Sequence, residues 1–208
     1  MERNQKVIYF KSLLATTVTS LVIYSASFAT QESSLAMEQI RKDYPNLLTV
    51  DRFGQVHKII DKQLSTGRTP LASAEDFISN FSTALDVDAN EFIERGPFPD
   101  QHTHQELMYV PETGQHKFTG VYYMQTADGL PVYGSRLMVL VRNVNGYPAV
   151  SVTTDLRDVT GYKKPRRVYS SEAIALMSAA TRLGKGVTIT TPELMVFAGT
   201  AELATPSF

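Results

Sequence analysis

Residues 117–154 read KFTGVYYMQTADGLPVYGSRLMVLVRNVNGYPAVSVTT. Apolar and polar residues alternate through much of this stretch, which is the period-2 pattern of strands with one buried face. Two turn dipeptides interrupt the pattern, Asp128-Gly129 and Asn145-Gly146, and they supply the positive φ angles that tight hairpins need. The sequence therefore predicts consecutive antiparallel strands, one of them over Val132–Arg142 and the next over Ala149–Thr154.

The strand predicted over Val132–Arg142 has two distinct sides. Side chains of a strand point alternately to opposite faces of the sheet. We expect Leu137, Val139 and Val141 to face the core, with Arg136 and Arg142 on the other side.

Two amphipathic helices are predicted on either side of this stretch. The first runs from about Ser73 to Leu85, with Ser73 as N-cap and Asp76 completing a capping box. Its apolar residues share one face, at the spacing of a helix packed on a sheet: Phe77, Ile78, Phe81 and Leu85. The second helix runs from Ser171 to Leu183 and ends at Gly184.

Shorter elements complete the prediction. They are a helix over residues 33–44, a hairpin over 47–64 that turns at Gly54-Gln55, a strand over 106–110 and a strand over 193–198 that has little chain left in which to find a partner. Residues 91–105 have no clear period. The whole pattern predicts an α+β fold, in which amphipathic helices pack on a twisted antiparallel β-sheet of hairpins.

The first 29 residues have the features of a secretory signal peptide. Three cations precede an apolar run over residues 13–24, and Ser27-Phe28-Ala29 offers small residues to a signal peptidase. We expect cleavage after Ala29 and a secreted or periplasmic product without a membrane segment. The chain has a net charge of −1, and removing the +2 of its first 29 residues leaves −3. Such a charge, with no long basic block, argues against nucleic-acid binding.

The residues needed for several kinds of catalysis are missing from the sequence. Cysteine is absent, which excludes disulfides, thiolate metal sites and cysteine nucleophiles. The four histidines are His57, His102, His104 and His116, and no two stand four apart as a His-Glu-x-x-His zinc motif requires. No nucleophile elbow or phosphate-binding loop occurs. We expect no enzymatic activity and no cofactor.

Three other groups of residues have more than one interpretation each. His102 and His104, with Glu106, are either exposed loop residues or a metal site. The tyrosines Tyr122, Tyr123 and Tyr133 are either cross-strand packing partners or part of an interface. The basic cluster over residues 163–167 is either a solvated linker, a protease cleavage site or a contact for an acidic partner.

The turn between the predicted strands resembles a known family. The residues Gln125…Gly129-Leu130-Pro131-Val132-Tyr133-Gly134, with Phe77-Ile78-x-Asn80 upstream, resemble the fungalysin/thermolysin propeptide region of secreted zinc metallopeptidase precursors. Residues 170–198 resemble the first helix and strand of a PepSY module. The resemblance implies a signal peptide over 1–29, a propeptide domain over 30–160 and a partial, cystatin/PepSY-like segment over 161–208.

In that family such a region acts as an intramolecular chaperone and as an inhibitor that keeps the zymogen inactive until the region is cleaved away. The resemblance therefore implies a zinc metallopeptidase domain as the partner, in cis or in trans. It implies that the turn could contact that partner through these residues: Gln125, Gly129, Pro131, Tyr133 and Gly134. The alternative is a stand-alone extracytoplasmic protein-binding module without a protease partner.

Overall fold

The structure is a computed structural model that describes residues 31–52, 55–98, 101–164, 171–183 and 193–199. The predicted cleavage site at Ala29 lies outside the described residues, as do Gly54, Gly184 and residues 165–167 of the basic cluster.

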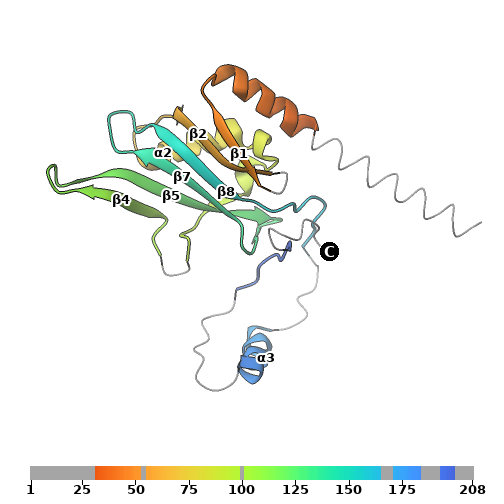
Figure 1. The fold of residues 1–208 in the computed structure, drawn as a ribbon. Helices are drawn as coiled ribbons and strands as arrows, with labels where there is room; N and C mark the ends of the chain where they lie inside the picture. Colours follow the sequence, from red (N-terminus) through yellow and green to blue (C-terminus); the bar gives the residue numbers. More distant parts are fainter. Residues whose placement is uncertain (1–30, 53–54, 99–100, 165–170, 184–192, 200–208) are drawn as a thin grey trace, which may run out of the picture.

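An antiparallel sheet of eight strands forms the body of the described chain (Figure 1). The strands follow the order β1-β2-β8-β7-β5-β3, and β4 and β6 also pair with β5. Their bounds are β1 Leu48–Arg52, β2 Gln55–Ser65, β3 Phe92–Glu94, β4 His104–Val110, β5 Gln115–Ala127, β6 Leu130–Pro131, β7 Arg136–Arg142 and β8 Ala149–Asp155. Together with the helices they make the α+β fold that the sequence predicts.

The long strand β5 organises the sheet. It pairs with β7 along one edge, and along its other edge it pairs with β4 and then with β3. The turn after β5 has Asp128 at φ 49° and Gly129 at φ 75°, the two positive angles that were expected there. The pairing confirms the predicted hairpin series, but β3 lies in the stretch for which no element was predicted.

The strand predicted over Val132–Arg142 forms only from Arg136 onward, as β7. The short strand β6 ends at Pro131, before the predicted start, so residues 132–135 lie between the two strands. Gly134, at φ 72°, takes the chain out of the ladder. The Ser135 hydroxyl then accepts from the backbone N–H of Gln125 at 3.1 Å and donates to the Val132 carbonyl at 2.8 Å. These two hydrogen bonds replace the missing ladder bonds.

Helix α2, Pro70–Phe81, begins three residues before the predicted start. Its N-cap is Thr69, whose side chain accepts from Ala72 N at 3.1 Å, and Pro70 occupies the first helical turn. The prediction of Ser73 as N-cap was therefore wrong. Ser73 is buried inside the helix, where its hydroxyl donates to the Tyr147 carbonyl at 2.5 Å and ties α2 to the β7–β8 turn.

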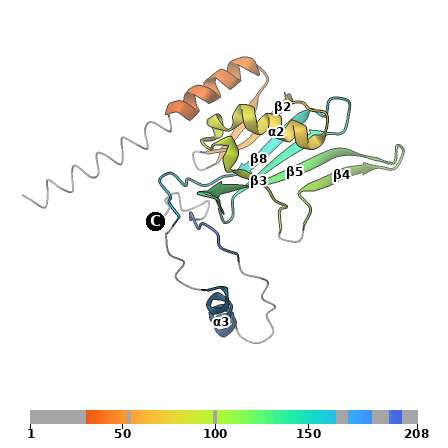
Figure 2. The ribbon, with the colours of Figure 1, turned by 180° about the vertical axis from the view of Figure 1, so that it is seen from behind.

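The core lies between α2 and one face of the sheet (Figure 2). Phe77 and Phe81 are fully buried, and their rings stack with centroids 4.4 Å apart. Leu137, Val139 and Val141 of β7 face this core with no exposed surface, whereas Arg136 and Arg142 are exposed, as predicted. The helix over residues 31–43 adds Met37 and Ile40 to the core, and two short 3-10 turns follow α2: η1 Thr83–Leu85 and η2 Ala89–Glu91.

The second predicted helix forms but does not pack on the sheet. Helix α3, Glu172–Leu183, stands apart from the sheet in both views (Figures 1 and 2). Its residues Ile174 and Met177 are 54% and 70% exposed, so the expected burial of this helix was wrong. The predicted strand over 193–198 is reduced to one bridge, in which Val196 pairs in parallel with Val132.

The stacked phenylalanines give the first test of this core. Phe81→Asp places an unpaired charge where the side chain is fully buried, and we expect the free energy of unfolding to fall by several kcal/mol, enough to unfold the chain. Ser79→Asp, on the exposed side of α2, should change it by less than about 0.5 kcal/mol. Urea unfolding followed by circular dichroism measures both, and equal stabilities would contradict this packing.

Tyr123 gives a second test. Its ring is buried in the core, its hydroxyl finds no hydrogen-bond partner among the described residues, and burial raises the pKa of that hydroxyl. Because an unpaired buried polar group costs free energy, Tyr123→Phe should leave the stability unchanged or raise it by about 1 kcal/mol. A fall in melting temperature would show that the hydroxyl is paired.

Candidate protein-binding site

Gln125 connects the motif turn to the segment after β8. Its side chain is 1% exposed, and both ends of its amide are used. Nε2 donates to the Arg157 carbonyl at 3.0 Å, and Oε1 accepts from the Arg157 backbone N–H at 2.9 Å. The glutamine thus acts as a short strand partner for residue 157, so its side chain is not available to a partner protein.

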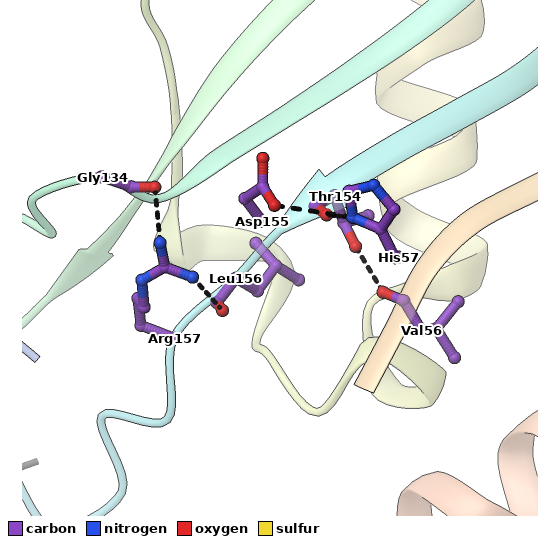
Figure 3. Close-up of polar contacts among 7 residues, drawn as sticks. All are labelled: Val56, His57, Gly134, Thr154, Asp155, Leu156 and Arg157. Atoms are coloured by element: carbon purple, nitrogen blue, oxygen red, sulfur yellow. Dashed lines mark hydrogen bonds and ion pairs between the residues drawn. The ribbon is translucent and has the colours of Figure 1, made fainter. Parts of the chain in front are cut away.

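Arg157 completes the same corner from the other side (Figure 3). Its guanidinium donates to the carbonyls of Gly134 and Leu156, each at 3.2 Å. A side chain at Gly134 would meet this guanidinium at 3.5 Å and would have to adopt φ 72°, an angle that favours glycine. Gly134 and Gln125 therefore both hydrogen-bond to Arg157, and these bonds hold the end of the sheet to the chain that follows β8.

The neighbouring contacts in Figure 3 belong to the sheet itself. His57 Nδ1 lies 2.6 Å from the Thr154 carbonyl, to which it donates, and 3.5 Å from Asp155 Oδ1. The Thr154 hydroxyl donates to the Val56 carbonyl, so β2 and β8 stay joined at this end. The cleft beside these residues measures about 30 Å³, room for roughly one water molecule, and is no site for a larger ligand.

The other motif residues lie at the surface. Gly129 is exposed in the turn, Pro131 is half-buried, and the Tyr133 side chain is 58% exposed. The Tyr133 ring lies 6.1 Å from the ring of Phe197. Of the five motif residues named in advance, Tyr133 is thus the large apolar side chain that a partner can reach. Tyr122 and Tyr123 are buried, which agrees with the packing interpretation for those two.

The sheet face opposite α2, here called the open face, is not covered by any described helix (Figure 1). Its side chains are those that alternate with the buried core residues along each strand. The apolar ones are half-buried or exposed, except Tyr122, which is 9% exposed: Leu48, Val50, Ile60, Ile93, Leu107, Phe118, Tyr122, Met124, Met138 and Leu140. The polar residues Ser151, Thr153 and Asp155 of β8 separate Leu48, Val50 and Ile60 from the other apolar residues, which lie on β7, β5, β3 and β4. An apolar area of this kind on a sheet face is typical of a protein-binding surface.

Cations border this apolar surface. Arg136 and Arg142 stand exposed at the two ends of β7, and Lys58 lies on β2 on the same face. The carboxylate of Asp155 also lies on this face, but it is already close to His57. The open face therefore combines an apolar centre with a positively charged border, which suits a partner with an acidic surface.

A shallow cleft of about 290 Å³ adjoins the open face at the tips of the hairpins. Phe118 and Arg142 belong to both the cleft and the open face, and Val110 and Val144 add apolar walls. The cleft extends the surface on which a partner can rest.

The histidines do not gather into a metal site. Within the described ranges, no group of three or more histidine, aspartate or glutamate side chains is placed to hold a metal ion. His104 Nε2 lies 3.1 Å from Glu94 Oε2, and His116 Nδ1 lies 3.1 Å from Glu106 Oε2. His104 and His116 thus each lie beside a carboxylate of another strand, and within the described residues His102, His104 and Glu106 are not grouped as joint ligands.

Comparison of this chain with protein-family models, with curated proteins and with solved structures gave no match. In the part of the chain that the structure describes, every helix is too short or too polar to cross a bilayer.

One feature of the site could not be predicted from the sequence, and another could be predicted only in part. The role of Arg157 depends on backbone groups that meet only in the folded chain. The open face was only partly foreseeable: the alternation along β7 predicts two faces, but nothing in it says that helices cover just one of them.

The Gln125 amide provides a sharp test of this corner. In Gln125→Glu a buried carboxylate would face the Arg157 carbonyl, and we expect a loss of several kcal/mol of stability at pH 7. Burial raises the pKa of such a carboxyl, so the protonated form, which can donate, is tolerated. The difference from the wild-type protein should therefore shrink as the pH falls to about 4.

The matched control is Gln115→Glu, an exposed position on the same strand. Its stability should follow that of the wild-type protein at both pH values. Equal behaviour of the two variants in urea unfolding would show that the Gln125 amide is not paired as described.

Proposed function

We propose that this chain is an exported propeptide-type module that assists the folding of a thermolysin- or fungalysin-like zinc metallopeptidase and inhibits it. The partner is joined in cis or bound in trans. The observation that carries the proposal is the open face, a sheet surface with an apolar centre and cationic border, in a chain whose sequence holds no His-Glu-x-x-His motif.

The open face has the chemistry of an interface rather than of a small-molecule site. On β5 and β7, Met138 lies opposite Tyr122, Leu140 lies opposite Gly120, and Phe118 lies opposite Arg142 at the border. Methionine and aromatic residues are enriched in protein interfaces, and arginine is enriched with them. The cleft of about 290 Å³ beside the open face is open to solvent, which also favours a protein as the ligand.

A rigid sheet is a suitable folding template. A protein whose contacts join distant parts of its chain folds slowly, because loop-closure entropy is lost before those contacts form. The sheet here is held by α2 from behind, so its open face is in place before a partner folds against it. The same contact, made across a substrate groove, would exclude substrate.

The resemblance of the motif turn to zinc peptidase propeptides supports the choice of partner class. Gln125, Gly134 and Arg157 fix the end of β5 and the start of β7, the two strands at the centre of the open face. The motif thereby shapes the proposed contact surface, even though Gln125 itself is buried.

A second candidate function is a stand-alone extracytoplasmic protein-binding module. It rests on the same open face and differs only in its partner, because an apolar face with a cationic border suits other acidic proteins as well as a peptidase. Inhibition and refolding assays separate the two candidates.

The test uses the chain without residues 1–29 and a thermolysin-like peptidase encoded by the same genome. We expect the chain to inhibit peptide hydrolysis and to raise the yield of active enzyme after dilution from denaturant. Arg142→Glu, on the border of the open face, should weaken inhibition at least tenfold, since reversing the charge opposes an acidic partner.

Arg68→Glu is the matched control, an exposed arginine in the loop before α2, and should inhibit like the wild-type chain. No inhibition and no gain in refolding would contradict the proposed function and leave the protein-binding module as the better account. Inhibition that both charge reversals leave unchanged would show that the contact lies elsewhere.

A further inference from the structure

Residues 193–199 lie in a groove at the motif turn. We name it the acceptor groove and define it by the apolar residues Ala127, Leu130, Val132, Val159 and Tyr162. Val196 and Ala198 insert into this groove and are 3% and 4% exposed. Phe197, between them, points outward and is 57% exposed, which is the alternation of a strand with one buried side.

Backbone hydrogen bonds add the segment to the sheet as a short parallel partner. Val196 N–H donates to the Pro131 carbonyl at 2.8 Å, and Tyr133 N–H donates to the Val196 carbonyl at 2.8 Å. Pro131 is the last residue of β6, and Tyr133 lies between β6 and β7. This end of β6 and the residues after it therefore offer one carbonyl and one N–H to an added strand.

Within the described residues, the other contacts of this segment lie at the surface. α3, which precedes it, stands away from the sheet, and Leu194 is 54% exposed. The exposed ring of Phe197 lies 6.1 Å from the ring of Tyr133. Arg95 forms a bidentate ion pair with Glu193, and the bond lowers the pKa of the Glu193 carboxyl. This pair is partly exposed, and such pairs contribute little to affinity. Among the described residues, the buried contacts of the segment are therefore those that it makes in the acceptor groove.

We propose that the acceptor groove is a binding site for an extended peptide and that residues 193–199 are its exchangeable occupant in cis. The site recognises backbone through Pro131 and Tyr133. It selects a β-branched residue followed, two positions later, by a small apolar residue, as Val196 and Ala198 show. Peptides of this pattern compete with the chain's own segment. The proposal is independent of any peptidase partner.

The experiment uses a fluorescent, acetylated and amidated peptide with the sequence of residues 193–199, ELMVFAG, and the chain without residues 1–29. In Val196→Asp the chain's own segment cannot fill the apolar groove, so the groove becomes free. We expect the peptide to bind this variant at least tenfold more tightly than it binds the wild-type chain, measured by fluorescence anisotropy. Val196→Ser, which adds no charge, should show the same change and serves if the first variant does not fold.

Two controls define the outcome. Leu194→Asp, at an exposed neighbouring position, should leave the groove occupied and the peptide affinity as in the wild-type chain. A peptide methylated on the valine nitrogen, which loses the bond to the Pro131 carbonyl, should bind at least tenfold more weakly. Failure of the folded variants to bind the peptide, equal affinity for the wild-type and Val196 variants, or undiminished binding of the methylated peptide would each overturn the proposal.

Discussion

The packing of α2 against one face of the sheet is the constraint on which the described structure depends. Phe77 and Phe81 stack in a core that the sheet closes from the other side through Ile59, Val139 and their neighbours. One 12-residue helix, joined by the helix over residues 31–43, suffices to bury this face. The remaining described helix, α3, stands apart from the sheet, so the opposite face is not covered by a described helix. The same arrangement that stabilises the chain thus leaves an apolar surface available to a partner.

The motif turn links the stability of this sheet to its two proposed binding surfaces. The Gln125 amide and the Arg157 backbone hold the end of β5, which carries Tyr122 and Met124 of the open face. The neighbouring turn directs Pro131 and Tyr133 toward the segment that contains Val196. The motif that resembles a propeptide signature therefore contributes here by positioning strands. Its buried members position the strands, and exposed members such as Tyr133 remain accessible.

The sequence was informative where a pattern depends on neighbouring residues. Alternation predicted β7 and its core face, and the Asp128-Gly129 pair predicted the turn that follows β5. It failed at the start of α2, where the local pair Thr69-Pro70 caps the helix instead of Ser73. It also missed β3, which forms because the distant strand β5 offers it an edge. The packing of α3 could not be judged from its own pattern, because an amphipathic face does not reveal whether a surface lies opposite it.

The methionines of this chain provide the most direct test of an open face that binds protein. Met124 and Met138 lie on that face, Met37 is a buried residue of the helix over residues 31–43, and Met108 is 62% exposed on β4. Hydroxyl-radical oxidation can be quantified at each methionine by mass spectrometry, with and without the zinc peptidase. The account predicts that the peptidase slows oxidation of Met124 and Met138 several-fold and leaves Met37 unchanged. Unaltered oxidation of Met124 and Met138 in a chain that demonstrably binds the peptidase would contradict it.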